Sequence, residues 1–383
     1  MIPFSYNRRS LFVRKVTTAA SLLGIALVVF VFSTVSMLAA GIEKTLVSTG
    51  YPDNAIALRK GSQAELMSGI EREAMNIMTI APEVASDAKG PLVTSELVVL
   101  IVLAKEAGGV SNVTVRGVGE RSLDVHAGVR LKEGRMFEHG KREIVVGQKL
   151  GGRFTSMRLG DTLKLGRDQW KVVGVLDAGG SGIDSEIWGS AEEIMGTFQR
   201  PVFSSVTARL KPGMFGAYRA RLQGDQRLGV DVKTEQQYYQ DQSRNLALFV
   251  SVLGTFVAIV FSLGAAIGAM ITMYAAVAAR MREIGTLRAL GFSAGSVLFG
   301  FVIESILLAL LGGAIGVALS SLMQLASFST MNFDSFSEVV FKFHLSPRIV
   351  VGSLIFSLAI GLVGGFAPAW RASRMKVVDA VRT

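Results

Sequence analysis

The chain has 383 residues, of which 50% are apolar and only 18% are charged, and its mean hydropathy is +0.44. A water-soluble domain usually carries about 25% charged residues, so a large part of this chain must be shielded from water in another way. The apolar residues gather in four long blocks, and the segment between the first two blocks resembles a soluble domain in composition. This pattern excludes an intrinsically disordered chain, a coiled coil and a purely soluble enzyme, and it predicts a membrane protein.

The absence of cysteine excludes a disulfide framework, a Cys-ligated zinc site and a Cys nucleophile. The net charge of +10 would suit either a nucleic-acid partner or the basic flanks of membrane helices. Much of the basic excess lies in short segments beside the apolar blocks. We therefore predict no nucleic-acid partner.

Four blocks are long enough to cross a bilayer, which takes about 20 helical residues. The first, residues 16–40, follows a basic segment as a signal peptide would, but it exceeds the roughly 7–15 apolar residues of a signal peptide. We therefore predict a retained helix. The other predicted membrane helices are residues 246–278, 296–322 and 348–370. The second is longer than a bilayer requires, so we expect it to begin outside the membrane as a stalk.

The basic residues beside the blocks predict the orientation. Residues 1–15, 279–295 and 371–383 are rich in Lys and Arg, whereas residues 323–347 contain a single lysine. The positive-inside rule places the first three segments in the cytoplasm. Residues 323–347 and the long segment 41–245 then lie outside. A multi-pass membrane protein with both termini in the cytoplasm is expected.

The outer segment is long enough for its own hydrophobic core. Strand and helix patterns alternate along it, which predicts a large α+β domain of two lobes with a boundary near residues 177–190. The predicted strands are 55–59, 96–104, 112–118, 142–146, 162–165, 169–176, 204–210 and 231–233. The predicted helices are 63–78, 190–198, 214–222 and a polar stretch, 235–245, that continues into the second membrane helix.

No motif for catalysis or metal binding stands out. The chain has no G-x-x-x-x-G-K-[ST] phosphate loop, and its three histidines lack the H-E-x-x-H spacing. Ser181 lies between glycines, but Ile183 stands where a nucleophile elbow needs the last glycine. We predict no catalytic residue, no metal site and no cofactor in this chain, and hence a non-enzymatic subunit.

Small residues recur at four-residue spacing in three predicted membrane helices, which lets a second helix approach closely. The pairs are Gly264 and Gly268, Gly312 and Gly316, and Gly361 and Gly365. Glycine is common in membrane helices in any case, but three pairs favour packing within a bundle or a dimer.

Glu304 lies inside the third predicted membrane helix, where a charge is costly unless it is paired, protonated or hydrated. We expect it to bond to a neighbouring helix. A place on a coupling or substrate path is the alternative.

The predicted cytoplasmic loop contains the sequence REIGTLRALG, residues 282–291. As a short helix it places Ile284, Leu287 and Leu290 at apolar spacing, with Gly291 just past its end. Such a helix suits the transmission of force to a cytoplasmic partner. It equally suits an interfacial helix bound to lipid headgroups.

This segment, followed by Phe292 and Ser293, closely resembles the signature of the FtsX/MacB-like permeases of ABC transporters. Three further stretches are similar to that family: the basic lead at 7–24, ESILLALLGGAIG at 304–316 and PAWRASRMKVVDAVR at 368–382. In the last stretch Val377 replaces the family's usual proline and Val381 its usual leucine. The order of one helix, a large outer domain and three more helices also matches.

The resemblance implies an outer domain of the MacB periplasmic core type and a coupling helix docked on a cytoplasmic ABC ATPase. Two copies of that separate ATPase would bind ATP and Mg, and the permease would pair with a second copy or a related chain. In this picture Arg282, Glu283 and Arg288 dock on the ATPase, and Gly285 and Ala289 allow close approach. The full set assigned to the coupling helix is Arg280, Arg282, Glu283, Ile284, Gly285, Leu287, Arg288, Ala289 and Gly291.

Two functions follow from the resemblance. In the first, ATP hydrolysis by the separate ATPase moves the outer domain and drives export or extraction of lipid, lipoprotein, peptide or drug. Membrane lipids and a periplasmic adaptor or lipoprotein would then be partners. The alternative is an FtsX-like mechanotransmission complex that regulates a cell-wall hydrolase without transport. The length of the outer domain favours export.

Overall fold

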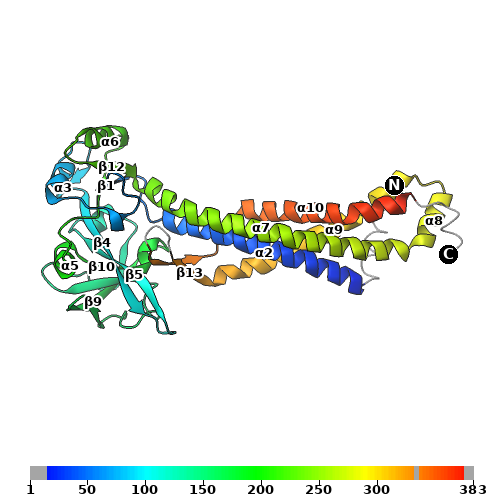
Figure 1. Cartoon of the computed structure of the whole chain (residues 1–383), viewed down its shortest axis with the longest axis horizontal. Helices are drawn as coiled ribbons and strands as arrows, with labels where there is room; N and C mark the ends of the chain where they lie inside the picture. Colours follow the sequence, from blue (N-terminus) through cyan, green and yellow to red (C-terminus); the bar gives the residue numbers. More distant parts are fainter. Residues whose placement is uncertain (1–14, 332–335, 375–383) are drawn as a thin grey trace. The chain divides into compact units, whose positions relative to one another are not determined.

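The computed structural model describes residues 15–331 and 336–374, which form two compact units (Figure 1). The first, which we call the helical unit, comprises the described residues up to 40 together with 248–326 and those from 343 onward. The second, the sheet unit, comprises residues 41–247 and the described part of 327–342. The predicted basic N-terminus, apart from Lys15, and most of the predicted tail lie outside the described residues.

Four helices of the described chain are long and apolar enough to cross a membrane. They are α2 (Lys15–Val47), α7 (Glu235–Ala278), α9 (Ala294–Ser321) and α10 (Pro347–Ser373). The polar stretch 235–245 and the apolar block 246–278 form one continuous helix, α7, as the sequence predicts. A short helix, α8 (Met281–Ala289), connects α7 to α9.

A ten-stranded mixed sheet organises the sheet unit. Its order is β12-β1-β11-β4-β5-β10-β7-β9-β6, and β8 pairs with β9. The strands are β1 (Asn54–Arg59), β4 (Val93–Ala104), β5 (Val110–Val118), β6 (Arg130–Gly134), β7 (Glu143–Gly147), β8 (Thr162–Leu165), β9 (Asp168–Asp177), β10 (Glu186–Ser190), β11 (Ser205–Arg209) and β12 (Val230–Thr234). A two-residue pair, β2 (Ser86–Asp87) and β3 (Gly90–Pro91), lies apart from this sheet.

The long strand β4 joins the two halves of the sheet. Residues 93–96 pair with β11 and residues 97–104 pair with β5. The predicted boundary near 177–190 does not divide the sheet, because β11 and β12 follow it in sequence yet pair with β1 and β4. Strands β6 and β10 were not predicted. Non-local pairing therefore decides the topology.

The helices of the sheet unit are short. They are α3 (Arg72–Thr79), α4 (Ser122–Val125), α5 (Ala191–Phe198) and α6 (Phe215–Gly224), with 3-10 turns η1 (Glu65–Met67) and η2 (Gly182–Ser185). The main core is formed by apolar residues of the strands together with residues of α5 and α6, and Trp170 is fully buried in it.

The predicted helix 63–78 is wrong, because the chain breaks between η1 and α3. Ile70 forms a β-bridge with Phe203, in which each backbone N–H donates to the other residue's carbonyl at 2.7 and 2.9 Å. The Arg200 guanidinium also donates to the carbonyls of Leu66 and Ser68. These tertiary bonds outweigh the local helical preference.

The predicted loop 323–347 contains a β-hairpin, β13 (Ser327–Met331) and β14 (Glu338–Lys342), that belongs to the sheet unit. Glu338 forms ion pairs with Lys105, at 2.6 Å, and with Arg153. The Lys149 ammonium donates to the carbonyl of Val340 at 3.1 Å. The chain between α9 and α10 thus returns to the sheet unit.

Candidate coupling site

Helix α8 is set off from its neighbours by two backbone features. Arg280, between α7 and α8, has φ −111° and ψ 16°, and its carbonyl accepts from the Ile284 N–H at 2.9 Å. After α8, Gly291 has φ +94°, a conformation that glycine adopts without penalty. Phe292 N–H donates to Leu287 O and Gly291 N–H to Arg288 O, both at 3.1 Å, which closes the helix end.

The two faces of α8 differ. Ile284 and Gly285 are buried, and Ile284 belongs to an apolar cluster with residues of α7, α9 and α10. Most other side chains are exposed or half-buried. The exposed ones include Arg282, Glu283, Thr286, Ala289 and Leu290, whereas Leu287 and Arg288 are half-buried. The helix is therefore anchored on one face and presents charge on the other.

Arg280 departs from the predicted coupling set because its side chain points into the bundle. Its Nη1 lies 2.9 Å from Oε2 of Glu304, and both residues are buried. Its guanidinium carbon lies 5.9 Å from the ring centroid of Phe301, one turn before Glu304. Two residues that the sequence singled out separately thus form one ion pair, and Glu304 bonds to the segment between α7 and α8.

Four of the six glycines lie at helix contacts. A Cβ at Gly316 would lie 2.6 Å from the Ala26 carbonyl oxygen, and one at Gly312 would lie 3.0 Å from Ile25 Cβ, so both bring α9 close to α2. On α10, a Cβ at Gly361 or Gly365 would meet α9 at 2.4 and 2.2 Å.

The remaining pair lies on α7. Among the residues that the structure describes, no atom comes within 4 Å of a Cβ built at Gly264 or Gly268. Their four-residue spacing is therefore not used for packing within this part of the chain.

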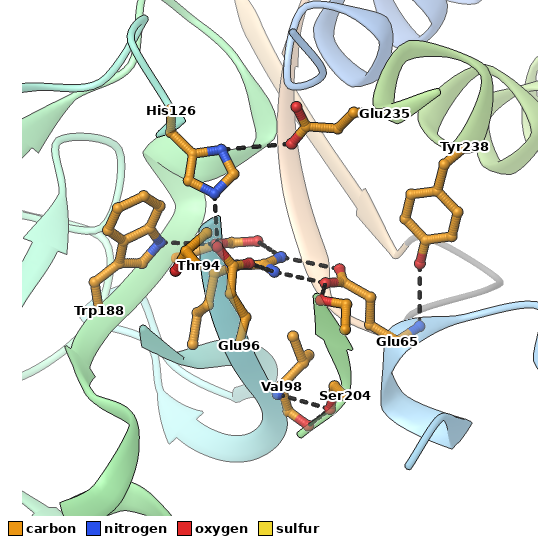
Figure 2. Close-up of polar contacts among 12 residues, drawn as sticks. Glu65, Thr94, Glu96, Val98, His126, Trp188, Ser204, Glu235 and Tyr238 are labelled. Carbon is orange, nitrogen blue, oxygen red and sulfur yellow. Dashed lines mark hydrogen bonds and ion pairs between the residues drawn. The ribbon is translucent and has the colours of Figure 1, made fainter. Parts of the chain in front are cut away.

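A charged cluster that the sequence did not predict lies inside the sheet unit (Figure 2). Arg116 on β5 binds Glu65 and Glu186 at 2.8 Å and Glu96 at 2.7 Å. His126 lies between two carboxylates, with Nε2 2.6 Å from Glu96 and Nδ1 3.4 Å from Glu235, the first residue of α7.

The ionisation of this cluster follows from its contacts. Burial raises the pKa of Glu96, but the charges of His126 and Arg116 outweigh burial and lower it to about 2. Burial lowers the pKa of His126, but Glu96 and Glu235 outweigh this effect and raise it to about 10. At neutral pH the cluster therefore holds charged groups whose bonds are made within the protein, which suits a structural role.

The sequence contains one signal that could have indicated the cluster. Glu96 begins a run, ELVVLIVLA, that predicts a buried strand, and Arg116 interrupts the apolar strand 112–118. A charge inside a buried strand needs a partner. The partners' positions, far along the chain, could not be predicted.

Metal binding finds no support in the described ranges 15–331 and 336–374, where no three His, Cys, Asp or Glu side chains are grouped to hold an ion. His139 lies apart from His126 and contacts the Ser190 hydroxyl at 2.9 Å.

Two family models match the chain. The MacB-like periplasmic core domain matches residues 16–222, and the FtsX-like permease C-terminal model matches residues 255–377. Together they cover the first membrane helix, most of the outer segment and most of the last three membrane helices, and residues 223–254 fall between the two matches.

Similar curated proteins include the macrolide export ATP-binding/permease protein MacB of Neisseria gonorrhoeae, 25% identical over 86% of this chain and 55% of that protein. The chain thus spans about half the length of this relative. The uncharacterized ABC transporter permease YknZ of Bacillus subtilis is 25% identical over 71% of this chain and 70% of that protein. Among solved structures, the periplasmic region of MacB from Actinobacillus actinomycetemcomitans is 14% identical, with a TM-score of 0.37 over 52% of this chain and 96% of that one.

Proposed function

Because this chain belongs to the MacB/FtsX family of ABC transporter permeases, we propose that α8 docks on a cytoplasmic ATPase and that ATP-driven movement of α8 reaches the sheet unit. The observation that carries this proposal is the division of α8 into a buried face and an exposed face with Arg282 and Glu283. In the alternative, a helix bound to lipid headgroups, the half-buried Leu287 and the exposed Leu290 would face the membrane.

Helix α7 supplies a direct route for the movement. It runs without interruption over 44 residues, which is about 66 Å of helix. Its first residues belong to the sheet unit, and its last residues lead into α8. We infer that displacement of α8 is passed along this one helix.

Export or extraction of a lipid, lipoprotein, peptide or drug is the cargo function that we propose. The MacB relatives are named as macrolide exporters, and a MacB-like core domain supports a similar class of function here. An FtsX-like complex that regulates a cell-wall hydrolase is the alternative. Recovery of a periplasmic adaptor or lipoprotein with the chain would favour export, and recovery of a wall hydrolase would favour the alternative.

The assembly that we propose contains two ATPase copies, which bind ATP and Mg, and a second permease chain. In the inner membrane, both termini and α8 would face the cytoplasm. The open face of α7 around Gly264 and Gly268 is the surface that we assign to the second permease.

The decisive experiment reverses two charges on α8. The full chain with Arg282→Glu and Arg288→Glu is purified from its membrane in mild detergent, and the co-purifying ATPase and its hydrolysis rate are measured. We expect loss of the ATPase or of its stimulation, because the charged face no longer matches its partner. Equal recovery and equal hydrolysis would overturn the docking role.

A matched control makes the same change of charge elsewhere. Arg130→Glu with Lys132→Glu lies on the exposed strand β6. This variant should retain the ATPase at the wild-type level.

A further inference from the structure

The Arg280–Glu304 ion pair lies deep in the helical unit. Glu304 is ten residues after the first residue of α9, or about 15 Å along the helix. Its Oε2 lies 2.9 Å from Nη1 of Arg280, and the two residues are 5% and 8% exposed. Charges at such a place are costly, and an apolar pair of similar volume is often at least as stable. The pair therefore needs an explanation other than stability.

The position of Arg280 supplies one. Arg280 is outside both helices at the point where α7 ends and α8 begins, and its backbone is not helical. Its N–H donates to the Val277 carbonyl at 3.0 Å, and its carbonyl accepts from Ile284. The residue at which the chain changes direction is thus the residue whose side chain is fixed to α9.

A second contact lies one turn further along α8. Ile284 is buried in the same apolar cluster as Val297 and Phe301 of α9. Phe301 and Glu304 are three residues apart and so share one face of α9. Arg280 and Ile284 therefore meet that face side by side, and α8 is held at two points.

We propose that the Arg280–Glu304 pair is a brace that holds the junction of α7 and α8 on α9. With the brace in place, displacement of α8 moves α7 and α9 together; without it, the chain bends at residues 279–280 and the displacement of α8 is not passed to α7. This inference rests on the proposed docking of α8 on an ATPase. Arg280 and Glu304 are positioning residues, since both lie inside the bundle.

An ion pair suits this task because its geometry is directional. An apolar contact tolerates sliding, whereas a guanidinium and a carboxylate at 2.9 Å hold one arrangement. Loss of one partner also leaves a buried charge, which favours opening of the junction.

The test measures whether α8 can move without α7. The chain has no cysteine, so introduced cysteines can carry spin labels without removal of native thiols. The first pair of labels, at Ala289→Cys on α8 and Val363→Cys on α10, reports the α8 shift. The second pair, at Ile271→Cys on α7 and Val363→Cys, reports the α7 shift. All three native residues are exposed. The distance between the two labels of each pair is measured by pulsed electron paramagnetic resonance in the full complex with its ATPase, with and without ATP.

In the wild type, ATP should shift both distances. In Glu304→Gln the α8 shift should remain, while the α7 shift should fall by about two-fold or more. The charge exchange Arg280→Glu with Glu304→Arg should restore the α7 shift. If ATP shifted both distances in Glu304→Gln as much as in the wild type, the brace would be overturned. It would also be overturned if the charge exchange did not restore the α7 shift.

One control separates this result from general destabilisation. Ser305→Ala removes a buried bond from α9 to the Gly361 carbonyl of α10 and should leave the α7 shift unchanged. If Glu304→Gln does not fold, Arg280→Lys, which keeps the charge but replaces the guanidinium, takes its place. The same result is expected of it: the α8 shift remains and the α7 shift falls. Absence of any shift in the wild type, or of the ATPase itself, would instead count against the proposed function.

Discussion

The sheet unit and the helical unit bury charge in different ways. In the sheet unit, Arg116 alone binds three carboxylates, and His126 binds two. In the helical unit, small residues make many of the contacts between helices, and the Arg280–Glu304 ion pair lies near α8.

The surrounding solvent explains this difference. Water drives the apolar side chains of the sheet unit together, so its core can accommodate a costly charged cluster. Lipid provides no such drive between helices, so α2, α9 and α10 depend on close contact at glycines. A charge that persists in the helical unit is therefore the better guide to function.

The largest expected effect comes from removing Arg116. Arg116→Met leaves three carboxylates without their guanidinium, of which Glu65 and Glu96 are buried. It should lower the free energy of unfolding of the sheet unit by about 3–5 kcal/mol. In a Trp370→Phe background the remaining tryptophans, Trp170 and Trp188, both report on this unit, so their fluorescence during chemical unfolding gives the value.

Arg72→Met is the matched control for this prediction. Arg72 also pairs with a glutamate, Glu192, but both side chains are more than half exposed. Its loss should cost at most about 1 kcal/mol. Equal losses in the two variants would contradict the difference drawn between buried and exposed pairs.

The next effect distinguishes the glycines of the helical unit. Gly316→Val forces a Cβ to within 2.6 Å of the Ala26 carbonyl, and we expect a loss of about 1–3 kcal/mol. Gly264→Val meets no described atom and should leave the thermal stability of the isolated chain in detergent nearly unchanged. If both variants lost the same stability, close contact at Gly316 would not be what holds α9 to α2.

The most gradual effect, at most about 1.4 kcal/mol for each pH unit, is a pH dependence that the cluster around His126 should confer. Because its pKa is raised from 6.5 to about 10, the folded chain binds an additional proton in that interval. The resulting stabilisation is complete below pH 6.5 and is lost as the pH rises toward 10, with a slope of up to about 1.4 kcal/mol per pH unit. Chemical unfolding from pH 6 to 10 measures it.

His126→Gln should flatten this slope, and His139→Gln in the same unit should leave it unchanged. If the slope were unchanged in His126→Gln, another group would be responsible for the loss of stability at high pH. His126 belongs to the sheet unit, so this dependence would be a property of that unit and would sharpen the contrast between the units.

Local patterns predicted much of the secondary structure correctly. The apolar blocks became α2, α7, α9 and α10, and the REIGTLRALG segment became α8 with Gly291 just past its end. Strands such as β4 and β9 also matched their predictions within a few residues. These features depend on the side chains of neighbouring residues, so they can be predicted from the order of residues.

The order of residues was therefore enough to predict which segments of this protein suit a membrane, where α8 lies, and that the charge at Glu304 needs a partner. The partners of the buried charges Glu96, Arg116 and Glu304 are known only from the folded chain. Contacts with residues far along the chain also broke the predicted helix at Ile70 and placed the β13–β14 hairpin in the sheet unit. The physical reason is that composition and periodicity act between near neighbours, whereas an ion pair or a β-bridge depends on distances that exist only once the whole chain has folded.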